Sequence, residues 1–236
     1  MKDFGIKTFE KLYTSGVVPV LDYNSSVWGY KDFSCINSVQ NKALRYFLGV
    51  HKFAPVLAIN GDIGWLPSKE RRWCNMIRLW KKLVTMDEHR ICKRVFNWDF
   101  HKCKNNWSSE VYAVLNFTGL TDEFDSKIPC VLSDVRKILY EKYSVEWKND
   151  LVNYPKLRTY RLIKFEFECE KYVDINLNRN ERSVLAQFIC GILPLRIETG
   201  RFVGEAEQDR LCKLCQENCV ENEIHFLMSC NFYNEI

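Results

Sequence analysis

Apolar residues recur at the spacing of an α-helix along most of this chain, and few residues interrupt that pattern. Only 10 glycines and 6 prolines are spread over 236 residues. Residues 33–48 show the pattern well, because Ser34 is a good helix start and Gly49 a good helix end. One stripe of this segment carries Ile36, Val39, Ala43, Leu44 and Phe47. The periodicity predicts a mainly α protein.

A second strong helix is predicted from Ser68, directly after Pro67, and weaker helices over 109–116, 133–150 and 180–192. The buried face of the second helix should carry Trp73, Met76, Ile77, Trp80, Leu83 and Val84. Residues 50–66 and 117–132 hold the Gly, Pro and Asp clusters and are predicted to be loops. Residues 156–173 mix alternating and helical patterns, and we favour a helix there.

Charge is divided unevenly along the chain. The net charge is +4, yet residues 69–104 carry 11 Lys and Arg against 4 Asp and Glu, and residues 201–236 carry 3 against 7. The hydrophobic content of 47% is sufficient for a core and excludes intrinsic disorder. The reversal of charge near residue 200 predicts a small module over 201–236. Before it we expect two helical regions, over 1–104 and 105–200.

The chain has 11 cysteines, and no apolar leader or membrane-spanning run is found in the sequence. This combination predicts an intracellular protein of the nucleus or cytoplasm, with no membrane partner. Seven cysteines are dispersed and are predicted to be small core residues: Cys35, Cys74, Cys92, Cys103, Cys130, Cys169 and Cys190.

The remaining cysteines form the strongest local motif of the chain. Cys212 and Cys215 are followed by His225 and Cys230 in the pattern C-x2-C-x9-H-x4-C. Two thiolates in a C-x2-C turn converge on one ion, and a short helix from about Val220 would bring the other two ligands to it. This sulfur-rich set favours Zn2+, and four protein ligands leave no open position, which indicates a structural site.

Two points about this motif stay open. Cys219 could replace Cys215 or Cys230 as a ligand, and Glu221 and Glu223 could orient His225. The alternative is a helical tail with inert thiols and a surface histidine.

Two basic clusters are candidates for binding nucleic acid. In the helix from Ser68, Arg71, Arg78 and Lys82 should form a basic ridge opposite the apolar face, and Lys69 in the same helix is a further candidate contact. The second cluster has aromatic residues among its charges and consists of Tyr154, Lys156, Arg158, Tyr160, Arg161 and Lys164. The alternatives are an ordinary solvated face and an amphipathic helix with its tyrosines in the core.

No catalytic residues are predicted. The four histidines lie outside the common catalytic motifs. The segment Tyr172-Val173-Asp174-Ile175 is superficially similar to a polymerase Tyr-x-Asp-Asp turn, but Ile175 takes the place of the second carboxylate, so the turn cannot hold two Mg2+ ions.

Several segments together resemble a known family. They are Val18–Tyr23 with Val27–Gly29, Ala43–Val50, Gly61–Pro67, Pro155–Tyr160, Ile197–Arg201 and the cysteine-rich tail through Cys230 and Tyr233. The chain resembles, from about Lys11 to Tyr233, the region downstream of the catalytic palm in reverse transcriptases of LINE-type non-LTR retrotransposons.

The resemblance implies a helical thumb and connector that packs against the template–primer duplex, followed by a CCHC zinc knuckle with Cys212, Cys215, His225 and Cys230 as ligands. The fingers, the palm and an endonuclease domain have no counterpart in this sequence, so polymerase activity is not expected. We therefore expect a non-catalytic, nucleic-acid-binding fragment whose partners are RNA or DNA, with the absent palm as a further candidate partner. The alternative is a zinc-stabilised protein-interaction module that binds no nucleic acid.

Overall fold

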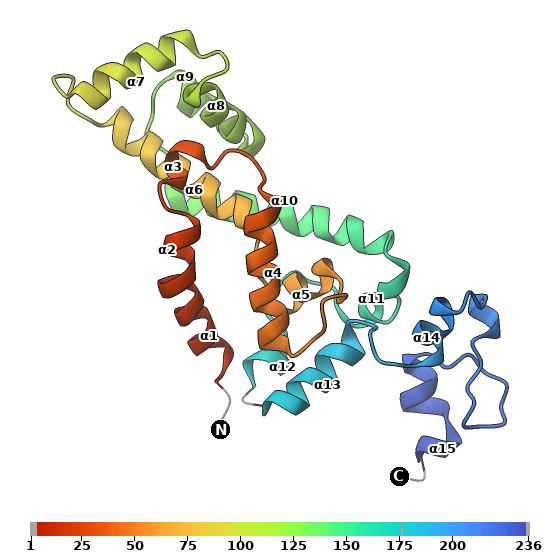
Figure 1. Cartoon of the computed structure of the whole chain (residues 1–236). Coiled ribbons are helices and arrows are strands. Elements are labelled where there is room, and N and C mark those ends of the chain that lie inside the picture. The colour runs from red at the N-terminus through yellow and green to blue at the C-terminus, as the bar shows by residue number, and fades with distance from the viewer. Residues whose placement is uncertain (1–3, 176, 235–236) are drawn as a thin grey trace. The chain divides into compact units, whose positions relative to one another are not determined.

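The computed structural model describes residues 4–175 and 177–234 and is mainly helical (Figure 1). Over these residues it contains no strand, and the one pairing of β type is an isolated antiparallel bridge between Leu211 and Val220. The prediction of a mainly α protein is therefore confirmed.

The α-helices are α1 (Ile6–Leu12), α2 (Val18–Leu21), α3 (Ser25–Trp28), α4 (Ser34–Leu48), α5 (Val56–Ile63), α6 (Ser68–Val84), α7 (Ile91–Lys102), α8 (Trp107–Thr118), α9 (Thr121–Asp125), α10 (Leu132–Val152), α11 (Tyr160–Ile163), α12 (Lys171–Asp174), α13 (Arg179–Ile189), α14 (Arg196–Phe202) and α15 (Asn231–Asn234). Short helices of other types are η1 (Tyr13–Val17), η2 (Pro155–Leu157), η3 (Glu207–Asp209) and η4 (His225–Ser229).

The chain forms two compact units, and each is discontinuous in sequence. Unit 1 comprises residues 1–7, 41–64 and 147–236, and unit 2 comprises residues 8–40 and 65–146. The chain passes from one unit to the other inside helices α4 and α10, which are 15 and 21 residues long. The charge pattern alone does not reveal these crossings, because charge does not show where a long helix leaves one core and enters another.

Helix α6 supplies the core of unit 2. Its predicted apolar face is buried, including Met76, Ile77 and Trp80. The Trp80 ring stacks on Phe124 with centroids 4.9 Å apart. The ammonium of Lys93, a buried residue, donates hydrogen bonds to the carbonyls of Leu83 and Val84 at 3.1 and 2.9 Å, and it thus caps the end of α6.

Unit 1 is built around Trp147, which is almost fully buried. Its indole nitrogen donates to the carbonyl of Leu57 at 2.8 Å, and its ring contacts Tyr160 and Phe167. Gly61 lies in α5 against these rings, where an added Cβ would lie 2.4 Å from the Tyr160 hydroxyl oxygen. Only glycine fits at this position, so a residue typical of loops sits inside a helix.

Several expected elements differ from the structure. Residues 50–66 and 117–132 contain helices α5 and α9, and 156–173 is broken into η2, α11 and α12. In α4, Val39 is exposed and Gln40 is buried, with the Gln40 amide donating to the carbonyl of Leu66 at 2.8 Å. Gly49 ends α4 with a φ of 72°, as predicted.

Of the dispersed cysteines, Cys35, Cys92 and Cys169 are exposed and Cys103 is half-buried, which contradicts the expectation that all seven lie in the core.

None of the described helices has the length and apolar character needed to span a membrane.

Candidate metal centre and cationic surfaces

The C-terminal tail folds back on itself through one isolated antiparallel bridge. The Leu211–Val220 bridge is flanked by hydrogen bonds from the Cys212 N–H to the Cys219 carbonyl at 2.9 Å and from the Glu221 N–H to the Arg210 carbonyl at 3.0 Å. These contacts close a loop over residues 212–219, which holds the C-x2-C turn. The short helix expected from about Val220 is present but begins three residues later, at residue 223, because Val220 belongs to the bridge.

His225 and Cys230 bracket the π-helical turn η4. His225 is its first residue and Cys230 follows its last, with the Cys230 N–H donating to the His225 carbonyl at 2.8 Å. The His225 N–H donates in turn to the Asn222 side-chain oxygen at 2.8 Å. One widened turn therefore brings the histidine and the last cysteine toward the C-x2-C loop.

The four predicted ligands meet at one point. Their donor atoms all lie within 4.8 Å of one another, with 3.9 Å between the sulfurs of Cys212 and Cys230 and 3.4 Å between the Cys215 sulfur and Nε2 of His225. Cys215 is half-buried and the other three are buried. This cluster could hold a metal ion.

The sequence leaves open the roles of three residues near the cluster, Cys219, Glu221 and Glu223, and the structure shows where each of them lies. Cys219 is exposed and belongs to a second group, with Glu217 and His225, that shares the histidine. A Glu221 oxygen accepts from the Arg196 N–H at 2.8 Å, and Glu223 accepts from Arg158 and Thr159. These hydrogen bonds of the two glutamates fix the tail to other parts of unit 1 rather than orient the His225 ring.

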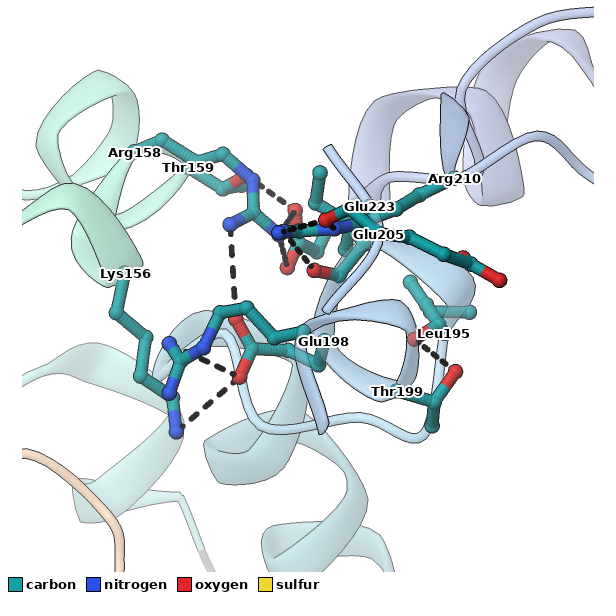
Figure 2. A network of polar contacts seen from close by, with 11 residues as sticks. Lys156, Arg158, Thr159, Leu195, Glu198, Thr199, Glu205, Arg210 and Glu223 are labelled. Atoms are coloured by element: carbon teal, nitrogen blue, oxygen red, sulfur yellow. Dashed lines mark hydrogen bonds and ion pairs between the residues drawn. The ribbon is translucent and has the colours of Figure 1, made fainter. Parts of the chain in front are cut away.

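A network of ion pairs surrounds the tail (Figure 2). Glu198 on α14 lies 3.3 Å from the Lys156 ammonium and 3.7 Å from a guanidinium nitrogen of Arg158. Arg158 also pairs with Glu223 at 2.8 Å, and Arg196 pairs with Glu205. Much of the second basic cluster is therefore neutralised within the protein.

The other members of the second cluster are also occupied. Lys164 is buried and pairs with Glu170 at 2.6 Å, and Arg161 donates to the Val152 carbonyl at 2.7 Å. The Tyr160 hydroxyl is buried and donates to the Ala58 carbonyl at 3.2 Å. Tyr154 is exposed. The alternating charges and rings in this stretch thus serve mainly internal contacts.

The predicted basic residues of α6 fall into two groups, one engaged in contacts within the protein and one exposed to solvent. Arg71 pairs with the buried Asp22 and donates to Gln40 at 3.1 Å, and the Lys69 ammonium lies 4.3 Å from the centre of the Trp73 ring. Arg78 and Lys82 are exposed, and no ion pair among the described residues includes them. The second half of the ridge is thus the part that is turned to solvent.

Unit 2 also exposes cations that were not named from the sequence. Unit 2 exposes Lys81, Arg90, Arg94, Lys102 and Lys104 in addition to Arg78 and Lys82, and none of the ion pairs among the described residues includes any of these seven. The signal for them was the excess of positive charge over residues 69–104. We call these seven residues the unit 2 cationic surface.

A buried carboxyl group, Asp62, was not singled out from the sequence. The Tyr172 hydroxyl donates to it at 2.6 Å, and burial raises its pKa to about 7, an effect opposed by this hydrogen bond and by the charge of Lys164. Asp62 has no exposed surface and therefore no access to a substrate. The segment 172–175 holds the end of helix α12 and not a hairpin turn.

Comparison of the chain with protein-family models, with curated proteins and with solved structures finds no match.

Proposed function

We propose that this chain binds nucleic acid without catalysing a reaction, and that the unit 2 cationic surface carries the binding. The observation behind the proposal is that seven exposed cations of one unit have no carboxylate partner among the described residues. Exposed Lys and Arg attract the phosphate backbone and release its counterions, which is the main source of sequence-independent affinity.

The proposal also draws on the resemblance to the region downstream of the palm in LINE-type reverse transcriptases. The segments that carry it include Gly61–Pro67 and Pro155–Tyr160. The chain would then supply a helical thumb and connector to a polymerase whose catalytic palm is a separate partner. Nothing in the segment 172–175 replaces a Tyr-x-Asp-Asp turn, since Ile175 offers no carboxylate.

We further propose that the ion held by Cys212, Cys215, His225 and Cys230 is structural zinc. With Zn–S near 2.3 Å and Zn–N near 2.0 Å, a tetrahedral site places two sulfurs about 3.8 Å apart and sulfur and nitrogen about 3.5 Å apart. The corresponding distances in the cluster are 3.9 and 3.4 Å. Three thiolates and an imidazole favour zinc over hard cations, and four protein ligands leave no position for a reactive water.

The test is nucleic-acid binding as a function of salt, measured by fluorescence anisotropy with a labelled duplex. The variant Arg78→Ala/Lys81→Ala/Lys82→Ala removes three of the seven cations and avoids Arg71, whose loss would leave Asp22 buried and unpaired. The slope of log affinity against log salt falls by about 0.9 for each phosphate that the protein no longer neutralises, so a decrease of about 2 to 3 is expected.

A matched control removes the same charge elsewhere. Lys11, Lys42 and Lys137 are exposed and lie outside the cationic surface. The variant Lys11→Ala/Lys42→Ala/Lys137→Ala should keep the wild-type slope to within about 1. Equal losses of affinity in both variants, or no binding by the wild type at low salt, would contradict the proposal.

A protein-interaction module is the second candidate, and one apolar groove favours it. The groove lies in unit 2, has a volume of about 450 Å3 and includes Val27, Ile91 and Val95, all of them exposed. If the wild type binds no nucleic acid and instead self-associates in sedimentation experiments, and if Ile91→Glu/Val95→Glu abolishes this association, the second candidate replaces the first.

A further inference from the structure

Unit 1 contains a larger groove that the proposed function does not use. It has a volume of about 1040 Å3, and it is formed by the end of α4, the loop before α5, the start of η2 and the segment from Ile192 through α14. Its walls are mainly apolar and include Pro55, Val56, Ile192, Leu193 and Pro194.

Three aromatic residues line this groove and are turned to solvent. Phe53 is 69% exposed and Phe202 is 79% exposed, and Tyr154 is also exposed. Exposure of several large apolar rings at one place is energetically unfavourable in water. A cluster of this kind marks a binding surface.

Phe53 is held in its exposed position. Its backbone N–H donates to Nδ1 of His51 at 3.1 Å, and the two rings meet edge to face with centroids 5.8 Å apart. The Lys52 ammonium lies 5.0 Å from the centre of the Phe53 ring. A ring that is fixed before binding loses little conformational entropy when a flat partner stacks on it.

The groove carries more positive than negative charge. Arg45, Lys52, Lys156 and Arg201 line it, against the single carboxylate of Glu198. Figure 2 shows Lys156 and Arg158 beside that carboxylate, at 3.3 and 3.7 Å. Arg201 lies 3.7 Å from it. Glu198 is one carboxylate against the four cations that line the groove, so the groove keeps an excess of positive charge.

Two further observations agree with a cationic groove. Burial lowers the pKa of His51, and the charges of Lys156 and Arg45 lower it further, against the opposing effect of Glu198. The Arg45 guanidinium donates to the Ala54 carbonyl at 2.8 Å, while its buried Nε has no hydrogen-bond partner among the described residues.

We propose that this groove binds the unpaired bases of a single-stranded nucleic acid, with bases stacked on Phe53 and Phe202 and phosphates held by Lys52 and Arg201. The inference rests on the proposed function and adds a second site with a different preference. A duplex keeps its bases stacked inside and offers only phosphates, whereas a single strand offers both ring faces and charge.

The experiment compares a labelled oligodeoxythymidine with a labelled duplex in anisotropy titrations. Stacking contributes about 1–3 kcal/mol per base, so Phe53→Leu/Phe202→Leu should weaken single-strand binding about tenfold or more and leave duplex binding unchanged. Phe165, which is 67% exposed in the same unit and lies outside the groove, gives the control Phe165→Leu, expected to bind like the wild type.

A photocrosslink provides a readout that a merely structural role would not produce. Irradiated oligodeoxythymidine should crosslink to peptides containing Phe53 or Phe202, as identified by mass spectrometry. In one outcome, the double variant keeps its single-strand affinity while removal of Arg78, Lys81 and Lys82 still weakens duplex binding. This result would leave the proposed function intact and overturn the proposal that the groove binds single strands. Crosslinks found only on unit 2, or a groove that binds an acidic, apolar peptide but no oligonucleotide, also overturn it. Absence of all nucleic-acid binding removes both proposals.

Discussion

Arg158 and Glu223, 65 residues apart in the sequence, form an ion pair in which one guanidinium nitrogen lies 2.8 and 3.1 Å from the two carboxylate oxygens. The Thr159 hydroxyl donates to the same carboxylate at 2.9 Å, and Glu223 is only 1% exposed. The pair joins the segment after α10 to the tail that carries the metal ligands. Docking of the tail therefore depends on satisfying one buried charge.

Arg158→Ala should destabilise unit 1 by about 3 kcal/mol, because it leaves the Glu223 carboxylate buried with one hydroxyl donor. Denaturant unfolding and limited proteolysis of the tail measure the effect. Arg161→Ala is the matched control, since Arg161 donates to the Val152 carbonyl and forms no ion pair among the described residues; it should cost under about 1 kcal/mol. Adding Glu223→Gln to Arg158→Ala should restore part of the stability, and no restoration would contradict this explanation.

Local patterns predicted the parts of the structure whose partners are close in sequence. The stripe of α6 from Trp73 to Leu83 is buried as expected, and the spacing of Cys212, Cys215, His225 and Cys230 was sufficient to predict the cluster. Helical periodicity and a C-x2-C turn are both set by neighbouring residues.

Distant partners account for most of the errors. Helix α5 was missed because Gly61 and Asp62 are typical of loops, yet Gly61 fits there only because Tyr160 and Trp147 pack against it. Arg71 looks like a surface cation until Asp22, 49 residues away, is placed beside it. Such pairings are decided by tertiary packing, which overrides local propensity.

Stability should fall as the pH rises from about 4 to 7 because of Asp62. Burial raises its pKa from 3.8 to about 7, so between these values the folded state holds a proton that the unfolded state releases. The stabilisation is complete below about pH 4 and lost above about pH 7, with a span of about 4 kcal/mol. Burial also raises the pKa of Glu70, in unit 2, to about 7, so two groups act in the same direction.

Asp62→Asn should remove the contribution of Asp62 to the fall in stability with pH. It should also raise stability at pH 8, because burying an uncharged amide does not require a charge to lose its hydration. Denaturant unfolding from pH 5 to 8 measures it. Asp174→Asn, which alters an exposed carboxylate in the same unit, should keep the wild-type slope. A parallel slope in Asp62→Asn would show that Asp62 is ionised in the folded protein.

Gly64→Ala should be among the most destabilising small substitutions in the chain. Gly64 ends α5 with a φ of 70°, and a Cβ there would lie 2.7 Å from the Cys169 backbone nitrogen and 2.9 Å from the Glu168 carbonyl carbon. Backbone atoms cannot rotate away, so overpacking adds to the strain of a left-handed conformation, for a total of about 3 kcal/mol. Gly119→Ala has a φ of 77° with no neighbour within 4 Å and should cost about 1 kcal/mol. Equal melting temperatures for the two variants would contradict the clash.

Removal of the proposed zinc should unfold the tail and leave the helices of unit 2 intact. Binding energy in small zinc sites is about 10–16 kcal/mol and is spent on folding, whereas the tail keeps itself closed mainly through the Leu211–Val220 bridge and its flanking hydrogen bonds. Elemental analysis should find about one zinc per chain in the wild type. Cys212→Ser/Cys215→Ser should lose the metal, and proteolysis should then cleave within 201–236 while circular dichroism retains most of its helical signal. Cys219→Ser is the matched control: it should keep the zinc, and loss of metal in this variant would instead assign the site to Glu217, Cys219 and His225.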